Sequence, residues 1–128
     1  MAKTLGDFIR EARAQIEEWD AETAHERIEE GGMLVVDVRE ADEYAAGHLP
    51  GAIHVPRGIL EAAAECGNKH RDERLCNARE QTLLLYCASG ARSAMACATL
   101  RHMGFTGAYS LSGGMDVWDA EGLPIEKS

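Results

Sequence analysis

Short apolar runs alternate with amphipathic segments along this chain, which predicts strands that alternate with helices. Continuous apolar runs at 33–38 and 82–86 are typical of strands buried on both faces of a parallel sheet. Shorter strands are expected at 52–55 and 108–111, and 15–19 could also be a strand. Apolar residues recur at helical spacing elsewhere, and the helices that we expect are a first one after Thr4, then 21–29, 42–46, 59–65, 93–103 and 115–120. This order favours an α/β fold with right-handed crossovers.

Several residues mark where these helices begin and end. Thr4 and Asp20 are suitable N-caps, because their side-chain oxygens can accept hydrogen bonds from the first turn of a helix. Gly31 and Gly47 are placed to end the helices that precede them. The segment 66–74 is rich in charged residues, and we expect it to be an exposed loop.

The composition indicates one domain. The chain has 128 residues, and 45% of them are hydrophobic, which is enough for a single core. We expect an N-terminal helical extension over residues 1–14 and one domain over 15–128. No apolar run approaches the length of a membrane span, and residues 1–7 lack the apolar core of a signal peptide, so a cytoplasmic location is expected. The formal net charge of −9 argues against nucleic acids and anionic membranes as partners.

Four cysteines occur, and no two are spaced as CxxC. In a reducing compartment they are expected to be thiols rather than a disulfide framework. Cys66, His70 and Cys76 could bind a metal, but their irregular spacing is a weak signal. Cys66 and Cys76 could instead resolve an oxidised or persulfidated Cys87, and the favoured interpretation is that they are ordinary loop cysteines. Cys97 is expected to lie in the core.

Cys87 lies at a junction between an expected strand and an expected helix, where a thiol can be made more reactive. It follows an expected strand and precedes an expected helix, and a short loop containing Gly90 joins the two. N–H groups at the start of a helix are unpaired and carry partial positive charge, so they would stabilise a thiolate and could hold an anion. In parallel sheets ligands bind at the carboxyl ends of strands, where both Asp37 and Cys87 lie. Cys87 is therefore predicted to be a nucleophile toward negatively charged substrates.

Three motifs follow one another along the chain. Residues 35–56 contain VVDVRE and GHLPGAIHVP, residues 87–93 read CASGARS, and residues 111–124 contain LSGGMDVW and GLP. In kind and order they resemble the signatures of the single-domain rhodaneses, a family of thiosulfate or persulfide sulfurtransferases, over about residues 15–126. The resemblance implies a three-layer sandwich in which a mostly parallel five-stranded sheet carries helices on both faces.

The resemblance also implies a mechanism and roles for the loop. The Cys87 thiolate would attack the outer sulfur of a donor and form a persulfide on Cys87. An acceptor would then remove the outer sulfur, which makes the reaction a ping-pong one. The donor would be a small anion, thiosulfate or a persulfide, and the acceptor a thiol, cyanide or a protein. No metal or other cofactor is expected. The residues implied in substrate binding are those of the loop, with Arg92 facing the anionic group of the donor: Ala88, Ser89, Gly90, Ala91, Arg92 and Ser93.

Other residues of the motifs are expected to support the site. Asp37 should pair with an arginine, either Arg39 or Arg92, and so fix the loop. Arg39 itself could be structural and bond to the turn after Asp42. His48 is expected to be a hydrogen-bonding residue of the scaffold rather than an acid or base, and Trp118 should lie in the core.

Two other functions are open at this stage. The domain could be a persulfide carrier for a partner protein, in which turnover of thiosulfate is incidental. A cysteine phosphatase or arsenate reductase is less favoured, because four residues separate Cys87 from Arg92. The phosphatases of the related fold have five, which opens a wider cradle for a tetrahedral anion.

Overall fold

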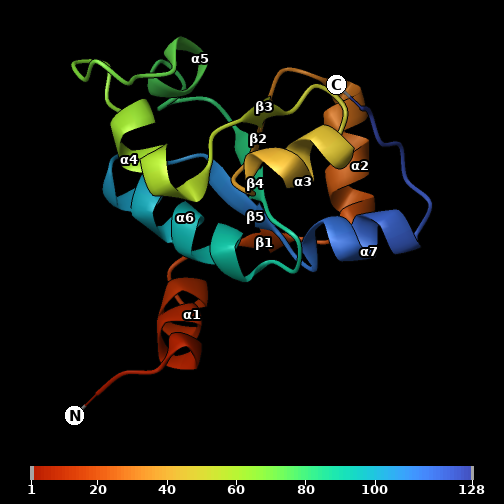
Figure 1. The fold of residues 1–128 in the computed structure, drawn as a ribbon, viewed down its shortest axis with the longest axis horizontal. Helices are drawn as coiled ribbons and strands as arrows, with labels where there is room; N and C mark the ends of the chain where they lie inside the picture. The colour runs from red at the N-terminus through yellow and green to blue at the C-terminus, as the bar shows by residue number, and fades with distance from the viewer. Residues whose placement is uncertain (1, 128) are drawn as a thin grey trace.

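The computed structural model describes residues 2–127 and contains one five-stranded, all-parallel sheet in the order β1-β5-β4-β2-β3 (Figure 1). The predicted α/β fold and the alternation of strands with helices are confirmed. The strands are β1 (Glu18–Trp19), β2 (Leu34–Asp37), β3 (Ile53–His54), β4 (Leu83–Tyr86) and β5 (Ala108–Leu111). The helices are α1 (Leu5–Arg13), α2 (Ala21–Glu30), α3 (Ala41–Ala46), a 3₁₀ turn (Arg57–Ile59), α4 (Leu60–Ala63), α5 (Glu73–Cys76), α6 (Ala91–His102) and α7 (Gly114–Ala120).

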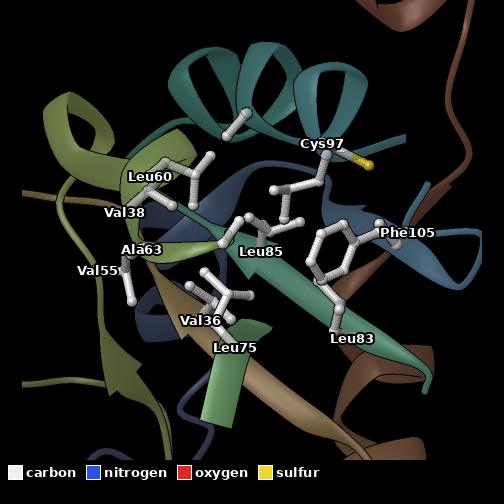
Figure 2. Close-up of a cluster of buried hydrophobic side chains, with 14 of the residues drawn as sticks. Val36, Val38, Val55, Leu60, Ala63, Leu75, Leu83, Leu85, Cys97 and Phe105 are labelled. Atoms are coloured by element: carbon white, nitrogen blue, oxygen red, sulfur yellow. The ribbon is translucent and has the colours of Figure 1, made fainter. Parts of the chain in front are cut away.

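The helices form layers on both faces of the sheet, as the resemblance implied. On one face Leu60, Leu75 and Leu100 of α4, α5 and α6 pack against Val36 and Leu85 of the central strands, and Figure 2 shows much of this cluster. On the other face α2, α3 and α7 cover the alternate residues of the same strands, and the buried members of that cluster are Ala21, Ala24, Val35, Leu49, Ala52, Leu84, Tyr86, Leu111 and Trp118. The predicted core position of Trp118 is confirmed.

The expected caps form and set the ends of the first two helices. Thr4 accepts a hydrogen bond from the N–H of Asp7, whose carboxylate in turn accepts from the N–H of Thr4. Asp20 accepts from the N–H of Thr23 in the same way at the start of α2. Gly31 follows the last residue of α2 with a φ of +78°, where a glycine is favoured.

Helix α1 lies outside the three layers and contacts α6 (Figure 1). Its buried residue is Ala12, which packs against Ala94 and Ala98 of α6. The remaining apolar face is not covered, because Leu5 and Phe8 are 66% and 51% exposed. This arrangement supports the expected N-terminal extension over residues 1–14, which stays a prediction as a domain boundary.

The segment between β3 and β4 corrects one expectation and bears out most of another. Cys66 and Cys76 form a disulfide, with their Cα atoms 5.1 Å apart, so the prediction of free loop thiols is wrong. The charged run 66–74 is a largely exposed loop up to Asp72, as expected, and its last two residues begin α5, where the side chain of Asp72 accepts hydrogen bonds from the first turn. The N–H of Asp72 donates to Ala63 O across 2.9 Å, and this contact folds the segment back onto α4. This contact within the segment helps to bring the two cysteines together.

The disulfide also removes two of the three ligands from the metal site considered for Cys66, His70 and Cys76. Over residues 2–127, no group of three or more His, Cys, Asp or Glu side chains is arranged to hold a metal ion. Within the same range, no helix is both long enough and apolar enough to cross a membrane.

Candidate active site

Cys87 follows β4 directly, at the carboxyl end of the central strand of the sheet. Its side chain is buried, with 1% of the residue exposed. The N–H of Gly90 lies 3.1 Å from Cys87 Sγ and the N–H of Ser93 lies 3.4 Å from it, so both donate toward the sulfur. The predicted juxtaposition of the cysteine with the start of the following helix is present, because α6 begins at Ala91.

Gly90 allows the loop to close around the sulfur. It precedes the first residue of α6 with a φ of +100°, a conformation that side chains with a Cβ rarely adopt. An added Cβ would also lie 3.2 Å from the N of Gly113. The backbone conformation therefore favours a glycine, and an added side chain would also crowd the segment that follows β5.

The loop is held from outside by α7. The N–H groups of Met115 and Asp116 donate to the carbonyl oxygens of Cys87 and Ala88, each across 2.9 Å. Gly114 makes this approach possible, since a Cβ on it would lie 2.4 Å from the carbonyl oxygen of Cys87. With their carbonyls bound by α7, the loop peptides are fixed in an orientation that leaves N–H groups directed at the sulfur.

Two serines connect the loop to β5. The Ser93 hydroxyl lies 3.6 Å from Cys87 Sγ, within reach of the thiol, and it also donates to the carbonyl of Gly90 across 3.3 Å. It shares a 2.9 Å hydrogen bond with the hydroxyl of Ser110, and both serines are fully buried. Ser110 was not among the residues expected at the site, and its position in the middle of a short apolar strand was the available signal.

The other loop residues lie at the surface of the cradle. Ser89 is exposed, and Ala88 and Ala91 are partly buried. Arg92 lies on the first turn of α6, where its guanidinium forms a two-point ion pair with Glu43 of α3, at 3.0 Å and 3.1 Å. The hydrogen bond from Arg92 lowers the pKa of Glu43 to about 2. Glu43 lies between the two motifs quoted for residues 35–56, and sequence reasoning gave it no role.

Asp37 lies in a buried network beside the loop. Of the two arginines considered for it, Arg39 is the partner, and it donates to Asp37 Oδ2 across 2.8 Å. Arg39 also donates to the carbonyl of Gly47 at the end of α3, across 2.7 Å. Tyr86, directly before Cys87, donates its hydroxyl to Asp37 Oδ2 at 2.7 Å and accepts from the N–H of Leu49. Asp37 thus fixes the strand that carries the cysteine.

His48 and Cys97, the other residues considered from the sequence, are both buried. His48 is buried, stacks on the ring of Tyr44 with centroids 4.0 Å apart, and lies 3.0 Å through Nδ1 from the carbonyl of Leu49. Its backbone also pairs with Glu126 near the end of the described chain. Cys97 is fully buried as expected, and its burial raises the pKa of the thiol to about 11. With this raised pKa, the Cys97 thiol stays protonated near neutral pH.

A family model described as the rhodanese-like domain matches residues 20–121, which include the loop, Asp37 and α7. The chain belongs to this family. The match begins after α1, so the N-terminal helix lies outside the part that defines a rhodanese-like domain.

Relatives of this rhodanese-like chain are named as sulfurtransferases. A sulfurtransferase of Allochromatium vinosum is 33% identical over 111 residues, which cover 86% of this chain and 94% of the relative. Thiosulfate sulfurtransferase 16 of Arabidopsis thaliana, a chloroplast protein, is 35% identical over 97 residues, covering 74% and 81% of the two chains.

A solved structure resembles the whole chain, α1 included. It is a Rhodopseudomonas palustris protein of unknown function, described as a possible tyrosine phosphatase. It is 26% identical and superposes with a TM-score of 0.90 over 98% of this chain and 96% of its own. The extension before the rhodanese-like domain is therefore a feature that the two proteins share.

Proposed function

We propose that this rhodanese-like domain transfers sulfane sulfur through a persulfide on Cys87. The observation that carries the proposal is the pair of N–H groups, from Gly90 and Ser93, that donate toward Cys87 Sγ. Such donors stabilise a thiolate before the reaction and an anionic persulfide sulfur after it. The sulfurtransferase names of relatives support the same chemistry.

The reaction has two displacement steps. The Cys87 thiolate attacks the outer sulfur of thiosulfate or of an organic persulfide, the S–S bond of the donor breaks, and sulfite or a thiolate leaves with the electron pair. A thiol, cyanide or a nucleophile on a protein then attacks the outer sulfur on Cys87 and releases the thiolate. Because Cys87 is nearly fully buried, the donor has to present its terminal sulfur end-on.

Intact-mass measurement tests the proposal. Incubation with thiosulfate or with a low-molecular-weight persulfide should add one sulfur atom to the protein, and cyanide should remove it. Cys87→Ala should take up none, while Cys97→Ala, which changes the other free cysteine of the described chain, should load normally. A protein that gains no sulfur from any donor would exclude the proposal.

A persulfide carrier is the nearest alternative, and it uses the same cysteine. Kinetics separates it from a thiosulfate enzyme. A carrier exchanges sulfur rapidly with a protein or low-molecular-weight persulfide while its KM for thiosulfate is very high. The acidic surface implied by the net charge of −9 would suit a basic partner protein.

A phosphatase is the second candidate, because a structure that resembles the whole chain is described in those terms. The four residues between Cys87 and Arg92 and the engagement of Arg92 by Glu43 both disfavour a tetrahedral dianion in the cradle. Hydrolysis of an aryl phosphate by the wild-type protein, lost in Cys87→Ser, would establish phosphatase activity and displace sulfur transfer as the main function.

A further inference from the structure

The guanidinium of Arg92 is already paired in this site. Both of its terminal nitrogens contact the carboxylate of Glu43, at 3.0 Å and 3.1 Å, in the two-point geometry that arginine forms with carboxylates. The two side chains are 37% and 31% exposed, so the pair lies at the edge of the cradle rather than in the core. An anionic donor that binds to Arg92 would therefore have to share or displace the carboxylate of Glu43.

Glu43 is held in this position by the start of α3. Its Oε1 accepts a hydrogen bond from the N–H of Glu40 across 2.9 Å, and the carboxylate of Glu40 caps the first turn in return. The pKa of Glu43 is lowered to about 2, so its carboxylate is ionised throughout the neutral range. Glu43 is therefore a fixed negative charge beside Arg92.

The surroundings of Glu43 offer an anion little compensation. A cavity of about 180 Å³ borders Glu43 and has a second carboxylate, Asp119, in its wall. The cation in the same wall is Arg39, which is bound to Asp37. Met115 and Ile125 complete part of the lining with apolar surface. Cys87 and Arg92 are not among the residues that line this cavity, so what it adds beside the ion pair is a second carboxylate, within a chain whose net charge is −9.

We propose that Glu43 sets the donor preference of this site by charge: it disfavours dianionic thiosulfate relative to an amino-acid persulfide, whose ammonium group lowers the net negative charge of the donor. The inference rests on the proposed sulfur transfer at Cys87 and names the substrate class of that site. Thiosulfate has to compete with Glu43 for Arg92, whereas the ammonium group of a cysteine persulfide offsets the negative charge of the donor. In either case the Cys87 thiolate attacks the terminal sulfur, the donor S–S bond breaks, and sulfite or the cysteine thiolate leaves.

The test compares the rates at which Cys87 loads from thiosulfate and from cysteine persulfide. In Glu43→Gln the second-order rate with thiosulfate should rise about fivefold, the scale of one partly exposed ion pair, while the rate with cysteine persulfide stays within twofold. Glutamine can still accept the hydrogen bond from Glu40, so the cap of α3 is kept. The matched control is Glu61→Gln, which removes a carboxylate paired with Arg57 on the surface, and it should change neither rate.

Two further measurements separate charge from geometry. Glu43→Asp keeps the negative charge but shortens the side chain, so its preference between the two donors should match that of the wild type. Raising the ionic strength should speed thiosulfate loading of the wild type, because salt screens repulsion between like charges, and should do so less in Glu43→Gln.

The outcomes are distinct. If Glu43→Gln slows both donors equally, Glu43 acts by positioning Arg92, and the inference is overturned. An unchanged thiosulfate rate in Glu43→Gln would overturn it as well. If Cys87 loads from neither donor in any variant, sulfur transfer itself fails, and the inference falls with it.

Discussion

The backbone N–H of Met115 donates to the carbonyl oxygen of Cys87 across 2.9 Å, so the first turn of α7 holds the residue that carries the nucleophile. Asp116 does the same for the carbonyl of Ala88. Because these carbonyl oxygens point toward α7, they do not face the sulfur. The groups of the loop that face Cys87 Sγ are then N–H donors, which stabilise negative charge on it. The positioning of the cysteine therefore depends on a helix that follows β5, more than twenty residues later in the chain.

Gly114→Ala should displace the loop that carries Cys87 and slow its sulfur uptake, with a moderate loss of stability. The new Cβ would lie 2.4 Å from the carbonyl oxygen of Cys87, so α7 has to move away from the loop. We expect the rate of sulfur uptake, followed by intact mass, to fall about tenfold or more. Gly122→Ala is the matched control, because Gly122 also has a positive φ of +71° but no atom lies within 4 Å of its added Cβ. Equal uptake rates for the two variants would contradict this account.

Tyr86→Phe should destabilise the fold. The lost hydroxyl leaves the buried carboxylate of Asp37 with one donor fewer and the N–H of Leu49 without its acceptor. We expect the free energy of unfolding in urea to fall by about 1.5–3 kcal/mol. Tyr109→Phe, at a partly buried tyrosine that stacks on Trp19, serves as the comparison and should cost less. A loss no greater than that of Tyr109→Phe would argue against the importance of the Asp37 network.

The same tyrosine predicts a loss of stability in alkaline solution. Burial, with the nearby Asp37 carboxylate, raises the pKa of Tyr86 above its ordinary value of 10.0. An acid whose pKa is higher in the folded state stabilises the fold below the pKa of the unfolded chain, and that contribution is lost as the pH rises above about 10. Urea unfolding at pH 9 and pH 11 should therefore show a steeper decline for the wild type than for Tyr86→Phe.

Glu43 predicts the opposite behaviour in acid. Its pKa falls from 4.5 to about 2 on folding, so it stabilises the fold above pH 4.5, and this contribution is lost as the pH drops toward 2. The difference in unfolding free energy between wild type and Glu43→Gln should therefore shrink between pH 6 and pH 3. A constant difference over this range would show that the ion pair with Arg92 contributes nothing to stability.

The Cys66–Cys76 disulfide should stabilise the segment between β3 and β4 without taking part in sulfur transfer. It closes a short loop, and Cys66→Ala/Cys76→Ala should unfold more easily by about 2–3 kcal/mol while loading sulfur on Cys87 at the wild-type rate. Alkylation of the denatured protein before and after reduction counts the thiols directly. Disulfides of this kind persist in oxidising compartments, so cell fractionation is the matching test of the expected cytoplasmic location.

The parts of the fold that the sequence predicted are those encoded by neighbouring residues. The buried strands before Asp37 and Cys87, the caps Thr4 and Asp20, and the glycine that closes the loop each depend on a local pattern. The ion pair of Glu43 with Arg92 joins residues 49 positions apart, and no spacing rule reveals it.

The same reason explains the other omissions. Tyr86 occurs in an apolar run and is a buried core residue, but the run does not reveal that its hydroxyl also donates to Asp37. A reducing compartment favours free thiols, and it is the fold of the segment 57–80 that brings the Cα atoms of Cys66 and Cys76 to 5.1 Å from each other. In each case the deciding contact is tertiary, and the residue type alone allows more than one partner.

Helix α1 is joined to the rest of the molecule mainly through small side chains, with Ala12 against Ala94 and Ala98 of α6. Such a contact buries little apolar surface, while Leu5 and Phe8 stay in water. The amides of residues 5–13 should therefore exchange their hydrogens through a local opening that leaves the sheet intact, well before those of β4. The helix that carries Arg92 would then expose Ala94 and Ala98 intermittently, so that the first event in the unfolding of this protein takes place beside its nucleophile.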